Sequence, residues 1–313
     1  MINKPRVLLA IAMTIAAAPA FAAGLGGSVK VDGSSTVYSI TEAVAEEFRG
    51  VEKDIRVTIG AAGTGAGYKK FCAGEIDLAG GSRPIKSDEI EKCKTAKVEL
   101  IELPVALDGL TVVVNPKNTF VKSLSFEQLR KIWEPGSKVK TWKDVDAAWP
   151  DQPIKLFGPS SEHGTFDYFT EVVVGKAKSS RNDYSAASDT NTLVSGVAGE
   201  PNALGYFGYG YYDEAKSKLR AVPVSKDGKA PAILPSTGAI ENGAYPLSRL
   251  LFVTVNKASA QKPECDRFVE FYLQQASQIA KSVGYTALPA SKLEQSKAKY
   301  KARKVGAWQE SAH

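Results

Sequence analysis

The chain has 313 residues, including 40 Lys or Arg and 34 Asp or Glu, which gives a formal net charge of +6 at pH 7. The basic residues are scattered among acidic ones, as in EAKSK, which is typical of solvated surfaces and disfavours a nucleic-acid-binding patch. Two His and three Cys, with no C-x-x-C, offer little support for a metal site, and we expect no metal and no cofactor.

Residues 1–23 have the pattern of a secretory signal peptide. A basic start, MINKPR, precedes an apolar run that ends in Ala20-Phe21-Ala22, which fits an A-x-A cleavage site. The run is shorter than the roughly 20 apolar residues that span a bilayer, and no later segment is long and apolar enough. Loss of Lys4 and Arg6 lowers the formal charge to +4. We therefore expect a soluble mature protein in the periplasm.

Short β-branched runs alternate with amphipathic segments through the first half of the chain. In chain order the pattern predicts strands at 28–33, 56–60 and 76–81, and helices at 36–50, 68–74 and 87–94. Ser87 is the expected cap of the third helix. Residues 98–115 should form two strands around Asp108-Gly109. This alternation is typical of an α/β protein with mainly parallel strands.

The second half continues the alternation. It predicts helices at 125–133, 191–199 and 263–283, strands at 153–158 and 245–256, and a strand with a turn at 203–212. The helix at 125–133 starts with a capping box, Ser125 to Gln128. We expect two α/β lobes, with residues 24–107 plus 251–313 in lobe I and residues 108–250 in lobe II. Ligands of such folds bind in the crevice at the carboxyl ends of strands.

Three predicted strand-to-helix junctions are built from small residues. They are Gly33-Ser34-Ser35-Thr36, Gly63-Thr64-Gly65 and Gly164-Thr165. The first N–H groups of a helix lack partners, and the helix dipole adds about half a positive charge. Glycine allows close approach, and Ser or Thr adds hydroxyl donors. Each junction alone also fits an ordinary N-cap, but three of them, shared between two lobes, predict a site for one small anion.

Charged residues would complete this site. Ser82-Arg83 follows a predicted strand and offers a hydroxyl beside a guanidinium, which suits an oxyanion; a surface Arg is the alternative. A carboxylate would accept a hydrogen bond from the O–H of a hydrogen phosphate and would repel sulfate. A ligand that leaves buried polar groups of a site unpaired can be rejected by a factor of about 10⁴ or more. Asp108 is the first candidate acceptor and Glu162 the second. A turn for Asp108 and a lysine pair for Glu162 are the structural alternatives.

Two of the three cysteines can pair in an oxidising compartment. Cys72 and Cys93 are close in sequence and flank one candidate loop, so we expect them to form the disulfide. Cys265 would then be a buried thiol.

Several strings together resemble the periplasmic phosphate-binding proteins of ABC importers, the PstS family. They are VDGSSTVYSITEAVAEEF, GTGAGYKKFCAGEIDLAGGSRPI, LPVALDGLTVVVNP, GTFDYFTE, ALGYFGYGYY and YPLSRLLFVTVN, and they cover nearly the whole mature chain. The resemblance implies a type II periplasmic-binding-protein fold, with two α/β lobes joined by a two-strand hinge around one phosphate. By position it implies binding roles for Ser34, Ser35, Thr36, Thr64, Ser82, Arg83, Asp108, Ser161, Gly164 and Thr165.

The chain departs from this family in the second lobe. Relatives commonly have Thr-Asp-Ser-Gly-Thr where this chain has Ser161-Glu162-His163-Gly164-Thr165, and Ala62 replaces a serine of some relatives. His163 could donate a hydrogen bond to the anion and add charge below about pH 6.5. It could equally cap the helix or point to solvent, and we leave both interpretations open.

The function expected from these features is capture of inorganic phosphate and its delivery to the membrane permease of an ABC importer, by a monomer and without chemistry. The alternative is a binding protein for phosphonate, phosphite, sulfate or molybdate. A secreted phosphatase is the contrasting class, because Ser160 and Ser161 lie beside His163. No G-x-S-x-G motif is present, and neighbours at one helix start cannot easily form a catalytic triad.

Overall fold

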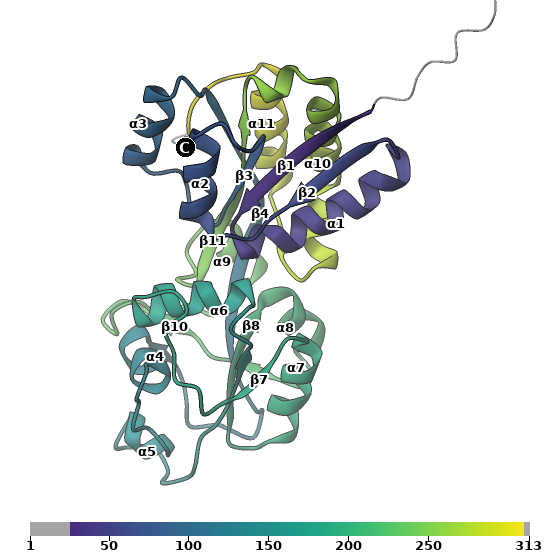
Figure 1. The fold of residues 1–313 in the computed structure, drawn as a ribbon. Helices are drawn as coiled ribbons and strands as arrows, with labels where there is room; N and C mark the ends of the chain where they lie inside the picture. The colour runs from purple at the N-terminus through teal and green to yellow at the C-terminus, as the bar shows by residue number, and fades with distance from the viewer. Residues whose placement is uncertain (1–25, 310–313) are drawn as a thin grey trace, which may run out of the picture.

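The computed structural model describes residues 26–309, so the predicted signal peptide lies outside the described residues. The chain forms two α/β lobes, one above the other in Figure 1, and two long strands run from one lobe into the other. The upper lobe contains both the N-terminal and the C-terminal described segments, and the middle of the chain forms the lower lobe. We call them lobe I and lobe II.

Lobe I is built around three parallel strands. They are β1 (Gly27–Gly33), β2 (Ile55–Ile59) and β3 (Leu78–Gly81), with β1 in the middle. Its helices are α1 (Ser35–Val51), α2 (Thr64–Cys72), α3 (Ser87–Thr95), α10 (Pro263–Ser282) and α11 (Ala290–Lys301), and a short 3₁₀ helix spans Ser259–Gln261. The carboxyl ends of β1 and β3 face the space between the lobes (Figure 1).

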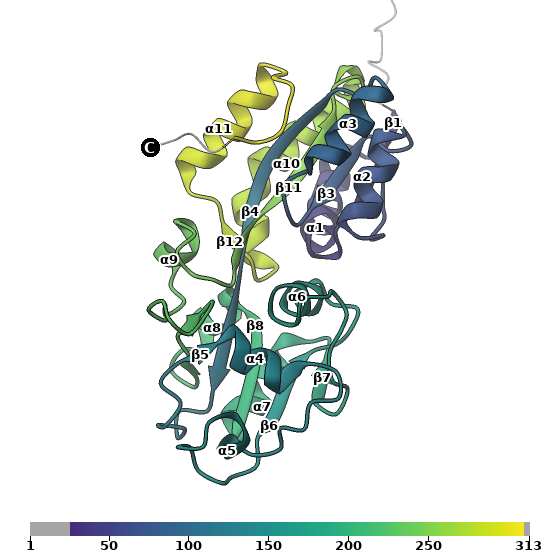
Figure 2. The same ribbon diagram turned by 90° about the vertical axis from the view of Figure 1, so that its left-hand side faces the viewer.

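Two long antiparallel strands connect the lobes. They are β4 (Leu100–Val114) and β11 (Ser248–Asn256), and the short strand β12 (Thr286–Ala287) pairs with β4. Their register places Arg249 opposite Asp108 and shifts between Leu251 and Phe252, beside Pro104. Proline has no N–H to donate to a ladder, which explains an irregularity at this point. Figure 2 shows both strands passing through the waist of the molecule.

Lobe II covers the far end of β4 with a second set of strands and helices. The strands are β6 (Lys155–Pro159), β7 (Ser185–Ala187), β8 (Ala203–Gly208) and β9 (Arg220–Ala221), with a separate pair of β5 (Leu124–Ser125) and β10 (Val224–Ser225). The helices are α4 (Phe126–Trp133), α5 (Trp142–Val145), α6 (Gly164–Phe169), α7 (Thr190–Gly199), α8 (Tyr209–Ala215) and α9 (Thr237–Glu241). A π-helical turn, Thr170–Val174, extends α6.

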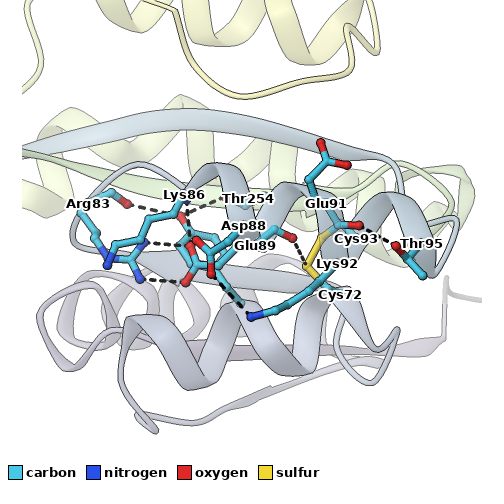
Figure 3. The surroundings of a disulfide bond; sticks show 11 residues. Cys72, Arg83, Lys86, Asp88, Glu89, Glu91, Lys92, Cys93, Thr95 and Thr254 are labelled. Atoms are coloured by element: carbon cyan, nitrogen blue, oxygen red, sulfur yellow. Dashed lines mark hydrogen bonds and ion pairs between the residues drawn. A yellow bond between two sulfur atoms is a disulfide. The ribbon is translucent and has the colours of Figure 1, made fainter.

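Apolar residues at helical spacing produce the packing, as expected. Val37, Ile40, Val44 and Phe48 are buried along α1, and Phe48 meets Phe268 of α10 with ring centroids 5.2 Å apart. Burial of each such side chain stabilises the fold by roughly 1.5–3 kcal/mol. The capping box at the start of α4 is confirmed. So are the Cys72–Cys93 disulfide, which joins α2 to α3 (Figure 3), and the buried thiol of Cys265.

Four sequence-based expectations were wrong in detail. The 98–115 segment contains one continuous strand, because β11 pairs with it from Leu100 to Gly109 and β8 pairs with it from Leu110 to Val114. The sheet is mixed, since β4 and β11 are antiparallel to their neighbours. The residues that follow β8, which were expected to form a turn, form helix α8. Lys86 precedes α3 as its cap and Ser87 is its first helical residue, because the Lys86 N–H bonds the Glu89 carboxylate at 2.8 Å.

Candidate anion-binding site

The first predicted junction lies where β1 ends and α1 begins. Ser34 is the N-cap, and its Oγ accepts a hydrogen bond from the Thr36 N–H at 3.2 Å. Gly33 has a φ of +142°, and a Cβ there would lie 2.2 Å from the Gly80 carbonyl oxygen. Only glycine fits this close approach of β1 and β3. Ser34 and Thr36 are both buried.

The second junction lies beside the first in lobe I. The Thr64 and Ser82 hydroxyls are 2.9 Å apart, and the Ser82 N–H donates to Thr64 Oγ1 at 3.2 Å. Thr64 is the first residue of α2, which begins within the segment expected to be a glycine loop. The end of β3 and the start of α2 thus bring together two hydroxyls from the predicted set.

The third junction belongs to lobe II. His163 is the N-cap of α6, and its Nδ1 accepts a hydrogen bond from the Thr165 N–H at 3.2 Å. Gly164 and Thr165 are buried, whereas Ser161 and Glu162 are exposed. Glu162 accepts hydrogen bonds from Ser160 and Ser188 at 2.7 and 3.0 Å. The capping interpretation of His163 is therefore the one observed, and its other nitrogen, Nε2, carries the proton in the neutral ring.

The starts of α1 and α6 meet across the two lobes. A Cβ on Gly164 would lie 2.5 Å from Thr36 Oγ1 and 2.6 Å from Thr36 N. Nearby, Ser35 Oγ donates to Asp167 Oδ2 at 3.0 Å. Ser35 and Thr36 come from lobe I, and Gly164 and Asp167 from lobe II. The first and third junctions are thus in contact across the two lobes.

Arg249 joins these elements, and sequence reasoning missed it. Its guanidinium donates to Asp108 Oδ2 at 3.1 and 3.2 Å, to Thr36 Oγ1 at 3.0 Å and to the Ser82 carbonyl at 3.3 Å. It also lies 3.6 Å from the centroid of the Tyr168 ring, a cation–π contact. A charged residue inside the apolar strand segment YPLSRLLF was the signal available in the sequence.

Asp108 is the most deeply buried acid of the predicted set. Its side chain is 1% exposed, and its second oxygen, Oδ1, has no hydrogen-bond partner within residues 26–309. Burial raises the pKa of Asp108, and the neighbouring Arg249 partly opposes that increase. A buried acceptor without a donor is costly. Asp108 therefore presents a free acceptor beside the α1 start.

Arg83 has a different environment from the one expected. Its two terminal nitrogens form 2.9 and 2.8 Å hydrogen bonds with the Glu89 carboxylate of α3 (Figure 3). Its guanidinium also lies 5.6 Å from the Tyr68 ring centroid. The charge of Arg83 is thus already neutralised within lobe I, while Arg249 is the cation that contacts Thr36 and Asp108.

Burial lowers the pKa of His163, although the charges of Asp108, Glu162 and Asp167 oppose that decrease. Burial likewise raises the pKa of Asp167, against the effect of its Ser35 hydrogen bond and of Lys178. His163 is accordingly neutral around pH 7 in this arrangement, which agrees with a nitrogen that accepts a backbone hydrogen bond.

A cleft of about 980 Å³ opens beside this cluster. Ser82, Arg83 and Arg249 line it, together with Tyr168 and residues of α9 and α11, which lie on the same side of the two long strands, α11 above α9, in Figure 2. The buried helix starts lie beside the cleft and do not line it. In the part of the chain that the structure describes, no helix is long and apolar enough to cross a membrane, and no three His, Cys, Asp or Glu residues are arranged to hold a metal ion.

Comparison with known proteins agrees with this architecture. Residues 18–276 match the family model for a PBP superfamily domain. Protein SphX of Synechococcus elongatus is 44% identical over 89% of this chain and 82% of its own length, and the phosphate-binding protein PstS of Staphylococcus epidermidis is 41% identical over 85% and 80%.

A solved structure provides a three-dimensional comparison. It is that of a possible phosphate-binding protein from Planctomyces limnophilus, which is 48% identical, covers 89% of this chain and 99% of its own, and superposes with a TM-score of 0.86. The fold is shared with this structure, and each of the three proteins matches at least 85% of this chain. The chain therefore belongs to the PBP superfamily and, within it, to the family that includes the PstS and SphX proteins.

Proposed function

We propose that this chain is a solute-binding protein that captures inorganic phosphate between its lobes in the periplasm and delivers it to the permease of an ABC importer. One of its relatives is named a phosphate-binding protein, the solved structure compared above is that of a possible phosphate-binding protein, and none of the proteins compared above is named as an enzyme. We propose capture without a reaction, by a monomer, after removal of residues 1–23. The hinge would lie at 107–108 in β4 and 250–251 in β11.

One observation carries the choice of ligand. Asp108 pairs with Arg249 through one oxygen and leaves the other without a partner at the meeting point of the helix starts. A hydrogen phosphate has an O–H that can donate to this oxygen, whereas sulfate has none and would be repelled. We propose that Ser34, Ser35, Thr36, Thr64, Ser82, His163, Gly164 and Thr165 surround the ion with neutral donors.

Calorimetric titration with phosphate, sulfate and molybdate tests this function. We expect phosphate to bind and sulfate to bind about 10⁴-fold more weakly, because a buried acceptor without a donor discriminates strongly. Asp108→Asn should weaken phosphate binding at least tenfold, because loss of a buried charged hydrogen-bond partner costs about 1–3 kcal/mol. The difference in affinity between phosphate and sulfate should also become smaller.

Asp88→Asn is the matched control, because Asp88 is exposed on α3 and contacts only Lys92 among the described ion pairs. It should leave both affinities unchanged. A wild-type protein that binds none of these anions, or that prefers sulfate, would overturn the proposed function. A chromogenic phosphomonoester should remain uncleaved.

A further inference from the structure

Glu102 is a buried acid that lies outside the candidate anion site. It belongs to the part of β4 within lobe I, and it is fully buried. Its Oε1 accepts hydrogen bonds from the Ile85 N–H at 2.7 Å and from the Tyr68 hydroxyl at 3.2 Å. Its Oε2 accepts one from the Trp308 N–H at 2.7 Å. One carboxylate therefore joins α2, the loop that follows β3 and the end of the described chain.

The loop that follows β3 contains residues of the candidate site. We call residues 82–85 the Ser82 loop. Ser82 and Arg83 line the cleft, and the Ser82 hydroxyl is one of the two that meet at the start of α2. Ile85 is buried, and its N–H is bonded to Glu102. The Ser82 loop thus contacts the cleft at one end and Glu102 at the other.

The end of the described chain is bonded to lobe I by several hydrogen bonds. We call residues 306–309 the C-terminal strap. The Gly306 N–H donates to the Leu100 carbonyl of β4 at 2.8 Å, and Lys299 Nζ of α11 donates to two strap carbonyls at 2.8 and 2.9 Å. Trp308 lines the cleft, as the start of the Ser82 loop does. The strap and the Ser82 loop are therefore two walls of one cleft that share a carboxylate.

The chemistry of this carboxylate makes the two walls dependent on each other. An ionised carboxylate only accepts hydrogen bonds, and a buried one that loses a donor is costly. Burial raises the pKa of Glu102, and the N–H groups of Trp308 and Ile85 oppose that increase. If the strap moved away, Oε2 would lose its donor. The strap and the Ser82 loop together therefore hold the Glu102 side chain in one orientation.

We propose that Glu102 is a positioning residue for the anion site, which couples the Ser82 loop to the C-terminal strap and makes the strap contribute to phosphate affinity. This inference rests on the proposed phosphate function and assigns a role to a residue, Trp308, that is 206 positions from Glu102 in the chain. When the strap is released, the Glu102 side chain reorients toward other donors and the Ile85 N–H loses its fixed partner. Ser82 then moves relative to the start of α2, and the hydroxyl donors no longer converge.

Two substitutions at Trp308 separate its N–H from its ring. Trp308→Ala removes the ring and keeps the N–H, whereas Trp308→Pro removes both, because proline has no N–H. We expect the Kd for phosphate, from calorimetric titration of the full mature chain, to be at least about fivefold higher in Trp308→Pro than in Trp308→Ala, the lower end of typical coupling between sites. Hydrogen exchange of the Ile85 amide should also be faster in Trp308→Pro. Equal values of either quantity in the two variants would overturn the inference.

Glu102→Gln tests whether the strap and the Ser82 loop act through the same side chain. Its amide has a single acceptor oxygen, so it cannot accept from both Ile85 and Trp308 on opposite ends. We expect Glu102→Gln to raise the Kd for phosphate at least about fivefold, and the addition of Trp308→Pro to raise it little further, because the link is already broken. If the two factors multiply in the double variant, the residues act independently and the coupling is wrong.

Glu99→Gln is the matched control. Glu99 directly precedes β4, its side chain is 58% exposed, and it pairs with Lys257 at 2.9 Å. The control should leave the Kd for phosphate and the exchange of the Ile85 amide unchanged. A wild type that binds no phosphate would overturn the proposed function, while exchange of the Ile85 amide would still test the coupling of strap and loop. The two Trp308 variants decide the inference if Glu102→Gln does not fold.

Discussion

At the scale of single residues, His163 combines two properties that conflict at low pH. Its Nδ1 caps α6 by accepting the Thr165 N–H, which requires that this nitrogen carry no proton. Burial lowers the pKa of the ring below its usual 6.5. Protonation would place a proton on the nitrogen that caps the helix, so the cap and the charged ring exclude each other.

The ligand-free protein should therefore lose stability through His163 as the pH falls. The folded pKa lies below the unfolded value, so this contribution is complete above about pH 6.5 and decreases as the pH falls toward the folded pKa. Asparagine caps helices well and does not titrate. We expect His163→Asn to lose less unfolding free energy than the wild type between pH 7.5 and 5, as measured by urea denaturation. Equal losses in the two proteins would contradict this role.

Arg249 also acts at the residue scale, because one guanidinium contacts both lobes. It bonds Thr36 of lobe I and Asp108 of the connecting strand, and it packs on Tyr168 of lobe II. Arginine suits this position because its planar group can bond at its edge and pack on a ring with its face.

At the scale of elements, strand pairing and a disulfide fix the positions of the charged residues around the candidate site. The antiparallel register of β4 and β11 places Arg249 opposite Asp108 without a turn or loop between them. On the other side, the Cys72–Cys93 bond holds α3 against α2, and α3 provides the Glu89 that neutralises Arg83 (Figure 3). The charge balance of the cleft therefore depends on the position of α3.

Removal of this disulfide should destabilise the chain. The bond closes a loop with a sequence separation of 21, for which the chain-entropy description gives about 3 kcal/mol. We expect Cys72→Ala with Cys93→Ala to lower the free energy of unfolding by about that amount in urea titrations. A reducing agent should bring the wild type to the stability of the double variant and leave the variant unchanged. If reduction leaves the free energy of unfolding of the wild type unchanged, the disulfide does not stabilise the fold.

At the scale of the whole molecule, the two lobes are in backbone contact where α6 meets α1. Gly164 of α6 lies against the backbone of Thr36, with no space for a side chain between them. We propose that closure of the lobes around phosphate uses this contact, because it brings the starts of α1 and α6 together. A methyl group there would hold the two lobes apart.

Gly164→Ala should therefore weaken phosphate binding at least tenfold, about 1.4 kcal/mol, while the ligand-free protein keeps its unfolding midpoint. Calorimetry measures the affinity, and small-angle scattering with saturating phosphate should show a more extended molecule than the wild type. Gly199→Ala is the control, since a Cβ there would meet nothing within 4 Å. Normal affinity in Gly164→Ala would show that closure does not use this contact.

The sequence predicted most helices and strands because the evidence for each of them is local. Helical spacing of Val37, Ile40 and Val44, and small residues at the ends of strands, depend on neighbours in the chain. The Cys72–Cys93 pairing was predictable for the same reason, since both lie in adjacent helices. Strand direction and the continuity of β4 were not, because they depend on a partner strand more than 130 residues away.

By itself, then, the sequence predicted the alternating strands and helices, the disulfide and the small-residue helix starts, through periodicity, cysteine spacing, capping and glycine placement, and its resemblance to the PstS family implied two lobes. Only the tertiary structure decided which charges meet. It joined Arg249 to Asp108, paired Arg83 with Glu89 and brought Asp167 to Ser35, because hydrogen bonds between side chains depend on distances in space that strand pairing and lobe contact set.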